Sequence, residues 1–141
     1  MANQIFFFTE DTYYKFKNKA NSKKWLLSIF KKEGYAVDFT NFIFCSDNYL
    51  LEINVKYLNH NTLTDIITFQ YNSPGESISS DIYISVDRCA ENAIKFNKSF
   101  DSELFRLLAH GVLHLCGYKD KNIADKTIMT QKEDYYLSLR T

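Results

Sequence analysis

The chain has 141 residues, a formal net charge of zero from 17 basic and 17 acidic side chains, and a hydrophobic fraction of 45%. This length and composition predict one folded domain over residues 1–141 and exclude a disordered chain. The sequence contains no run of about 18 apolar residues, so we expect no transmembrane helix and no membrane partner. The apolar start at residues 5–8 is short and follows no basic residue, which argues against a signal peptide.

Hydrophobic periodicity and the positions of turn residues predict the helices and strands. In chain order we expect a strand at residues 4–9, a helix at 22–33 that Gly34 ends, a strand at 41–45, a helix capped by Asp47 that runs to about residue 58, a strand at 66–69, a turn at Pro74-Gly75, a strand at 82–86, a helix capped by Asp87 that runs to about residue 96, and helices at 102–116 and 123–137. These elements do not alternate regularly, which favours an α+β fold: a small mixed sheet of about four strands covered by about five helices.

Lysines gather in the first quarter of the chain. Residues 1–35 contain seven lysines and three acidic residues, so this part has a charge of +4 and the remainder a charge of −4. Four of the lysines share the first predicted helix with apolar residues: Lys23, Lys24, Lys31 and Lys32. The pattern is typical of an amphipathic helix, whose basic face is either simply solvated or a surface that follows nucleic-acid phosphates.

The three cysteines, Cys45, Cys89 and Cys116, are odd in number and lack C-x-x-C spacing. They predict free thiols in a reducing compartment, and therefore a cytoplasmic protein. Cys116 is close in sequence to the histidines described next. However, a residue two positions after His114 points to another helix face, which favours a core thiol over a metal ligand.

Two of the three histidines, His110 and His114, are four residues apart in the apolar helix predicted at 102–116. Side chains at i and i+4 share a helix face, so both imidazoles can reach one point. Gly117 can adopt the left-handed conformation that ends a helix, after which Asp120 can return a carboxylate to the same point. Two imidazoles and a carboxylate leave an open coordination position, so these three residues predict a catalytic metal site. The alternative is a coincidental histidine pair on an apolar helix.

The residues between the histidines exclude one class of metal enzyme. Zinc proteases of the H-E-x-x-H type carry a glutamate directly after the first histidine, and it acts as general base. That position is Gly111 here, and residues 111–113 contain no acid. Peptide hydrolysis by that mechanism lacks its base.

The stretch from His110 to Tyr118 resembles the signature H-G-x-L-H-L-x-G-Y-D-H of the YbeY family, the bacterial rRNA-maturation endoribonucleases. Two further blocks are similar to that family in order and spacing. Residues 53–58 and 64–69 resemble L-N-x-x-Y-R and T-D-V-L-S-F, and residues 80–82 resemble G-D-I. The three blocks span about residues 50–137, which is more specific than one metal motif.

The resemblance implies an α+β fold and a zinc ion held by three side chains. It also implies a metal-dependent endoribonuclease that acts on single-stranded RNA in maturation of the small-subunit rRNA 3′ end and in ribosome quality control. Its partners would be rRNA precursors, the small ribosomal subunit and assembly factors, and not DNA.

Two positions depart from the family pattern. Asp120 stands where the family has its third histidine, and Lys119 replaces the aspartate before it. An anionic ligand lowers the charge of the loaded site and also suits iron or manganese, so other divalent transition metals stay open beside zinc. Leu58 replaces an arginine implied in RNA cleavage, and a leucine cannot hold a phosphate. His60 is either its substitute, as donor or proton carrier, or a surface loop histidine.

Three hypotheses follow. In the first, the chain is an endoribonuclease in which His110, His114 and Asp120 hold a metal whose bound water attacks the phosphodiester, or which polarises a phosphodiester oxygen. In the second, the chain is a non-catalytic ribosome-assembly factor with a structural metal. The third is an Fe(II) oxygenase with two histidines and one carboxylate, but such sites normally lie inside a β-sandwich, which a helix-borne pair does not indicate.

Overall fold

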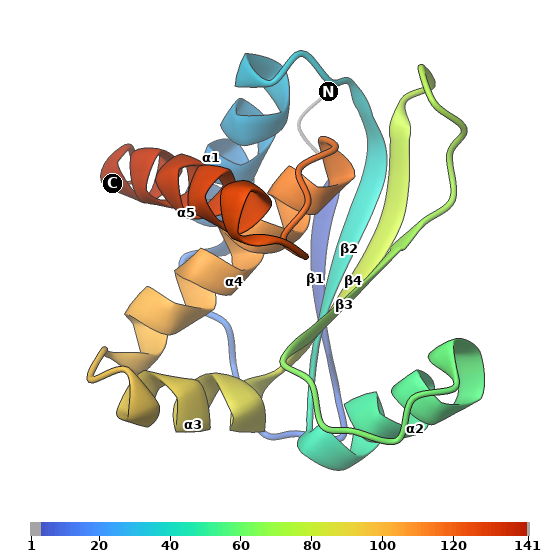
Figure 1. The fold of residues 1–141 in the computed structure, drawn as a ribbon, viewed down its shortest axis with the longest axis vertical. Coiled ribbons are helices and arrows are strands. Elements are labelled where there is room, and N and C mark those ends of the chain that lie inside the picture. The colour runs from blue at the N-terminus through green and yellow to red at the C-terminus, as the bar shows by residue number, and fades with distance from the viewer. Residues whose placement is uncertain (1–3, 141) are drawn as a thin grey trace.

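The computed structural model describes residues 4–140. Along these residues it has the following strands and helices: β1 (Ile5–Glu10), α1 (Lys19–Lys32), β2 (Val37–Cys45), α2 (Asp47–Leu58), β3 (Ile66–Gln70), β4 (Ile78–Ser85), α3 (Val86–Lys95), α4 (Phe100–Leu115) and α5 (Ile123–Ser138) (Figure 1). The strands form one sheet in the order β1-β2-β4-β3. Strands β1, β2 and β4 are parallel, and β3 is antiparallel to β4 at one edge. The α+β fold with a mixed four-stranded sheet and five helices is therefore confirmed.

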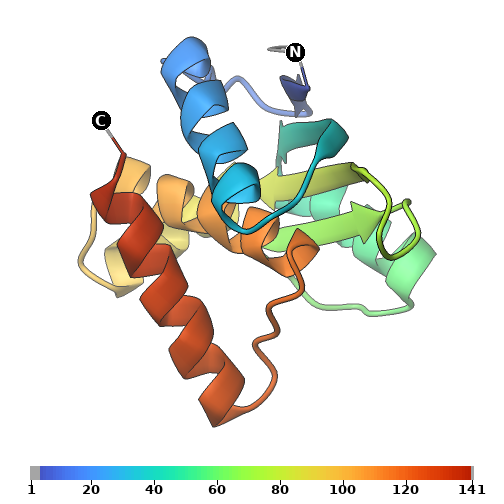
Figure 2. The same cartoon turned by 90° about the horizontal axis from the view of Figure 1, so that it is seen from above.

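The two faces of the sheet are covered by different helices. Phe42 of β2 and Ile82 and Ile84 of β4 are fully buried in the main core, together with the apolar residues of α1 and α4. Tyr83 points to the other face, because neighbouring residues of a strand alternate, and it packs in a smaller cluster around Leu50 of α2. Helix α5 lies along the outside of α4, away from the sheet (Figure 2).

Helix α4 is the central helix of the main core, and its Leu108 and Val112 are fully buried. It lies close against the sheet at Gly111. A Cβ atom there would be 3.0 Å from Cδ1 of Ile82 and 3.2 Å from Cδ1 of Ile66. A larger residue would force the side chains of Ile82 and Ile66 to shift, so the glycine between the two histidines allows that turn of α4 to lie against the sheet.

The predicted N-caps of α2 and α3 are wrong by one residue. Ser46 and Ser85 are the caps, and each hydroxyl accepts a hydrogen bond from the backbone N–H three residues later, at 3.1 Å. Asp47 and Asp87 lie in the first helical turns instead. Asp47 accepts a hydrogen bond from the Ser85 hydroxyl and forms an ion pair with Arg88 at 3.2 Å, so its carboxylate joins the two helix starts.

Several boundaries also differ from the prediction. Strands β2 and β4 begin four residues earlier than expected, at Val37 and Ile78, because the two pair in parallel from these residues onward. Helix α1 begins three residues early, at Lys19, and Val86 begins α3 instead of ending a strand. Strand length therefore depends on the partner strand more than on local composition.

All three cysteines are buried and free, as predicted. Burial raises the pKa of each thiol to about 12, so none of them is a thiolate near neutral pH. Within residues 4–140, the helices are too short or too polar to cross a membrane.

Candidate metal centre

The two histidines of α4 and the aspartate beyond it meet as the sequence predicts. His110 and His114 are one helical turn apart, with ring centroids 4.5 Å from each other. Gly117 has a φ of 97°, which reverses the chain after the helix. Oδ2 of Asp120 then lies 3.2 Å from Nε2 of His110 and 3.4 Å from Nε2 of His114. One ligand atom from each of these residues lies within 4.8 Å of the others.

These separations fit a bound transition metal. Ligands about 2.0–2.1 Å from a zinc ion in tetrahedral geometry lie roughly 3.3–3.4 Å from one another. The two distances to the Asp120 oxygen are of this size. The three side chains would hold the metal, and all three line a cavity through which a further ligand can reach it. The donor set therefore suits a divalent metal with one open position, as in catalytic rather than closed structural sites.

Glu133 of α5 orients the first histidine. Its Oε2 lies 2.6 Å from Nδ1 of His110, and its Oε1 accepts a hydrogen bond from Arg106 at 2.8 Å. Arg106 also bonds the exposed Asp134 at 2.6 Å. Because Glu133 accepts the Nδ1 proton, a neutral His110 presents the lone pair of Nε2 toward Asp120. A carboxylate behind a ligating imidazole is a frequent feature of metal sites.

The acidic residues around His110 shift its pKa in the direction opposite to the effect of burial. Burial by itself would lower the pKa of His110, but the hydrogen bond and charge of Glu133 and the charges of Asp120 and Asp65 outweigh it, and the pKa is raised. The same acidic surroundings favour a dication over a proton at this position, since the dication carries twice the charge.

Sequence reasoning missed Glu133, although a signal was present. Met129, Glu133 and Tyr136 follow one another at intervals of four and three residues and are all buried. An acid in the buried stripe of a helix requires a partner, because an unpaired buried charge is costly. The partners, His110 and Arg106, are on another helix, so the pairing could not be read from spacing alone.

We expect Glu133→Gln to weaken zinc binding by about 10- to 100-fold, which is the usual effect of losing such a partner. The amide keeps the shape of the side chain but loses the charge that supports His110. The matched control is Asp134→Asn, which removes the other carboxylate on Arg106 without touching the histidine. Affinity is measured by competition with a chromophoric chelator, and equal losses in both variants would contradict the role of Glu133.

His60 does not join the cluster of donor atoms, but it faces the same space. A cavity of about 790 Å³ is lined by His110, His114 and Asp120 and also by His60 and Leu58. His60 is exposed, and its backbone N–H donates to the carbonyl of Asn54 at 3.2 Å. The Asn54 side chain donates to the carbonyl of Thr62 at 2.8 Å, which fixes the loop that carries His60.

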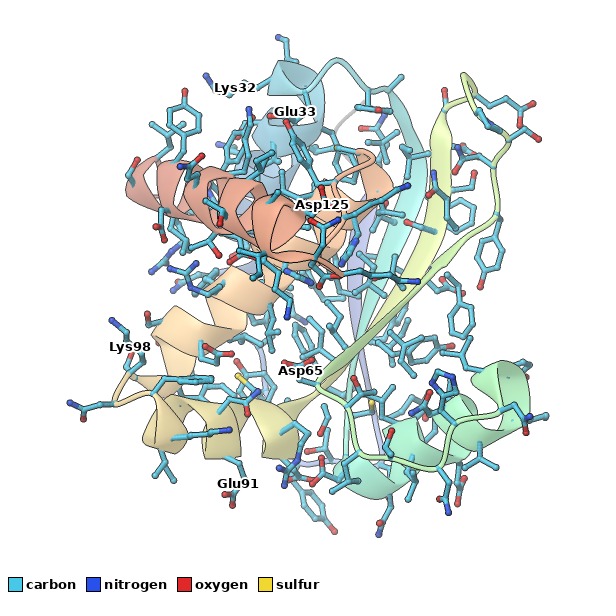
Figure 3. All side chains as sticks on the ribbon, viewed as in Figure 1. Lys32, Glu33, Asp65, Glu91, Lys98 and Asp125 are labelled. Carbon is cyan, nitrogen blue, oxygen red and sulfur yellow. The ribbon has the colours of Figure 1, made fainter. Side chains whose placement is uncertain are left out.

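Two acids near the site were not proposed from the sequence as functional. Asp65 lies where the loop from α2 enters β3 (Figure 3), and Asn92 donates a hydrogen bond to it at 3.1 Å. With Glu103, His110 and Glu133 it lines a cavity of about 350 Å³ behind the donor cluster. Burial raises the pKa of Asp65 and of Glu103. They add to the acidic environment of the candidate site.

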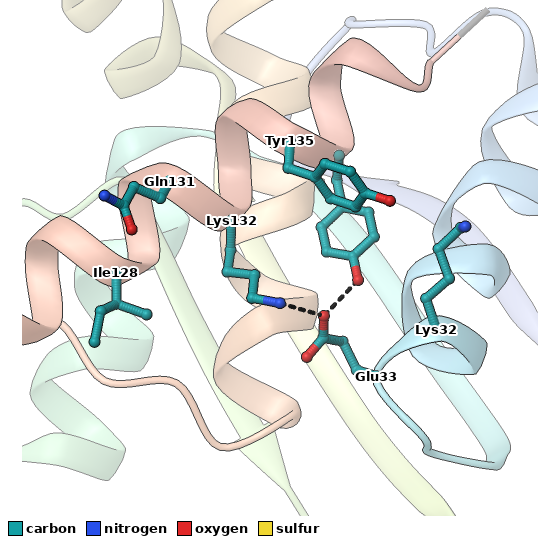
Figure 4. Close-up of a pocket in the computed structure, with 7 residues that line it drawn as sticks. Lys32, Glu33, Ile128, Gln131, Lys132 and Tyr135 are labelled. Atoms are coloured by element: carbon teal, nitrogen blue, oxygen red, sulfur yellow. Dashed lines mark hydrogen bonds and ion pairs between the residues drawn. The ribbon is translucent and has the colours of Figure 1, made fainter.

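The loop that carries Asp120 is anchored to the end of α1. Glu33 accepts hydrogen bonds from Tyr118 at 2.7 Å, from Lys132 at 3.2 Å and from Tyr136. Figure 4 shows Lys132 reaching Glu33 from α5, beside a cavity of about 550 Å³ that Lys32 also lines. Burial acts to raise the pKa of Glu33, but the hydrogen bonds from Tyr136, Tyr118 and Lys132 outweigh it and lower the pKa.

The lysines of α1 do not form one uniform face. Lys24, Lys31 and Lys32 are exposed, whereas Lys23 is half-buried with its Nζ 5.7 Å from the centre of the Phe6 ring. Lys32 lines the cavity beside Glu33. The basic helix predicted from the sequence is present, but its charges are divided between the β1 side and the α5 side.

The fold and the site together define a class: an α+β protein in which two histidines of one helix and an aspartate of the following loop cluster beside an open cleft. Comparison with known proteins agrees with this class. Residues 5–140 match the family model described as "Endoribonuclease YbeY". A protein of that name from Cytophaga hutchinsonii is 49% identical over 136 residues, which cover 96% of this chain and 95% of the relative. Another from Flavobacterium johnsoniae is 48% identical over 132 residues, with 94% of each chain covered.

A solved structure also resembles the fold. The solution structure of TM1509 from Thermotoga maritima has a TM-score of 0.66 and 28% sequence identity, and the match covers 94% of this chain and 86% of that one. The chain belongs to the YbeY endoribonuclease family, and the resemblance stated from its sequence is confirmed.

Proposed function

We propose that this protein is a metal-dependent endoribonuclease that cleaves single-stranded RNA in the maturation of the small-subunit rRNA 3′ end and in ribosome quality control. The observation that carries the proposal is the cluster of His110, His114 and Asp120 at ligand spacing, open to a cleft, in a chain of this family. The relatives' name supports RNA as the substrate. We place the protein in the cytoplasm, with the small ribosomal subunit and assembly factors as its partners.

The residues of the site have different roles in the proposed reaction. His110, His114 and Asp120 would hold one divalent transition metal per chain, zinc in our proposal. When bound, such a metal supplies a Lewis acid and lowers the pKa of water. Lys121 lines the cleft and can contact a phosphate. His60, on the rim, is our candidate for the hydrogen-bond donor or proton carrier that replaces the family's arginine at Leu58.

The test is a cleavage assay with the purified full chain and an RNA that spans the 3′ end of the small-subunit rRNA precursor. We expect cuts in unpaired RNA when zinc is present, none after chelation, and none in a duplex or in DNA of the same sequence. Absence of metal-dependent cleavage, both on this RNA and on whole precursor subunits, would contradict the proposal.

Leu58 favours one alternative, a non-catalytic ribosome-assembly factor with a structural metal. A leucine provides no donor for a phosphate or a developing oxyanion. In that case the chain would still bind the small subunit in a sedimentation assay, and loss of the metal would unfold it without changing any RNA cleavage.

The third ligand can be tested separately. We expect Asp120→Ala to strip metal from the protein and His60→Ala to leave the metal in place, because among residues 4–140 it is Asp120 whose carboxylate lies within ligand spacing of both histidines. Asp120→His should retain metal and make bound water more acidic, since it removes an anionic ligand. Metal content is measured by mass spectrometry, and loss of metal in His60→Ala alone would overturn the assignment.

Binding to single-stranded RNA should fall with increasing salt. We expect charge reversal at Lys23, Lys24, Lys31 and Lys32 together to flatten this dependence, because the slope of log K against log salt decreases by about 0.7 for each phosphate that is no longer neutralised. Reversal of Lys95 and Lys98, at the end of α3, is the control. An unchanged slope in the four-lysine variant would mean that RNA docks elsewhere, across the metal cleft.

A further inference from the structure

The cleft beside the candidate metal centre is lined in part by apolar side chains. Besides the three donor residues, Leu58, His60 and Leu63 line its volume of about 790 Å³. Leu58 is 42% exposed and Leu63 is 49% exposed. Single exposed leucines are ordinary on protein surfaces. Two that line the same cleft as a candidate catalytic site form an apolar contact surface next to the chemistry.

The charged residues that line the cleft indicate which part of an RNA this surface contacts. Among the described residues that line the cleft, Lys121 is the only lysine or arginine, whereas Asp65 and Asp120 are acidic. Phosphates bind mainly through basic side chains. Away from a bound metal, the cleft therefore offers few contacts to a phosphate backbone, whereas its two leucines suit the uncharged face of a base.

The edge strand β3 adds hydrogen-bonding groups to the same wall. Ile66 points toward Gly111 of α4. Thr68 and Gln70 follow Ile66 at intervals of two, so they share its side of the strand, and both line the cleft. A hydroxyl and a carboxamide each offer a donor and an acceptor, which matches the polar edge of a nucleobase.

We propose that Leu58 and Leu63, with His60, form a subsite that binds one unpaired base of the RNA, and that Thr68 and Gln70 contact the edge of that base. The subsite rests on the proposed function, since it assumes an RNA substrate. It gives a physical reason for a single-strand requirement, because a paired base hides both its edge and its faces.

The test is equilibrium binding of a fluorescein-labelled, unstructured RNA of about 12 nucleotides, within the usual site size for single-strand binding. The full chain is used with its metal chelated, so that no RNA is cut, and thermal unfolding checks that the chelated chain stays folded. In a series of RNAs, each nucleotide in turn lacks its base. We expect removal of one base, or of two neighbouring ones, to weaken binding by about 5- to 150-fold, and removal of the others to have little effect.

The variants locate that base. Leu58→Ala and Leu63→Ala should weaken binding of the intact RNA but should not weaken binding further when the RNA lacks the sensitive base, since the leucines then have no base to contact. Leu139→Ala is the control, because Leu139 is also 42% exposed but lies at the end of α5. Both leucine variants are at exposed positions, and thermal unfolding checks that they remain folded.

Three results would overturn the subsite. Removal of the base could weaken binding equally at every position, or the loss of affinity from a leucine variant could be the same whether or not the RNA has the sensitive base. The third result is that a duplex binds as tightly as the unpaired RNA. The same experiments distinguish failure of the subsite from failure of the proposed function. If binding shows the coupling but the metal-loaded chain cuts no RNA, the subsite stands and the nuclease proposal falls. If the chain cuts RNA but binding shows no such coupling, the nuclease proposal stands and the subsite falls.

Discussion

His114→Ala is expected to lose most of its metal and to show no measurable cleavage of single-stranded RNA. It removes one of three protein ligands, which should cost clearly more than the 10- to 100-fold in affinity expected for an outer partner such as Glu133. His114 is a better target than His110 for this purpose. The carboxylate of Glu133 is bonded to His110, so alanine at position 110 would leave that buried acid with Arg106 alone and would also destabilise the fold.

Zinc per chain is measured by mass spectrometry after dialysis, together with the cleavage rate and the temperature of unfolding. Cys116→Ala is the control, because this buried thiol with a raised pKa is close in sequence but is not among the donor atoms. It should retain its metal. A double variant of His110 and His114 that kept full metal occupancy would show that the metal binds somewhere else.

Leu58→Arg is expected to raise the rate of RNA cleavage at saturating substrate. Leu58 is the last residue of α2 and lines the cleft that contains the donor cluster. An arginine there can contact a phosphate and stabilise charge as it develops, and one such donor typically changes kcat by about 10²–10³. The Michaelis constant can increase in the same variant, since the arginine no longer offers the base an apolar surface.

Leu63→Arg is the matched control, because it adds the same charge to the same cleft at a different position. An equal increase in both variants would mean that charge alone is responsible. His60 can be tested in the same background. If His60 is the donor or proton carrier proposed above, His60→Ala lowers kcat in the natural chain and has a smaller effect once position 58 is arginine. If kcat does not rise in Leu58→Arg, the lack of an arginine at position 58 is not what limits cleavage by this protein.

The histidine cluster shows how far local sequence can predict a site. His110 and His114 are one helical turn apart, and the reversal at Gly117 brings back Asp120 only six residues after His114. Helix periodicity therefore determines the relative positions of the two histidines, and the glycine permits the return of Asp120, whose loop is also held by the contact of Tyr118 with Glu33. The order of the elements and the α+β class also followed from residue patterns, because strands and helices repeat with different periods.

Only the tertiary structure decided the surroundings of that cluster. Glu133 meets His110 because α5 packs along α4, and no spacing in the chain specifies that contact. The same holds for the cleft that brings His60 and Leu58 opposite the donor residues, and for the early starts of β2 and β4, which depend on their mutual pairing. Sequence alone determined what lies within about one turn of α4, because short-range geometry is set by backbone dihedral angles. The orientation of the ligands and the shape of the cleft depend on contacts between residues far apart in the chain, which form only when the core packs.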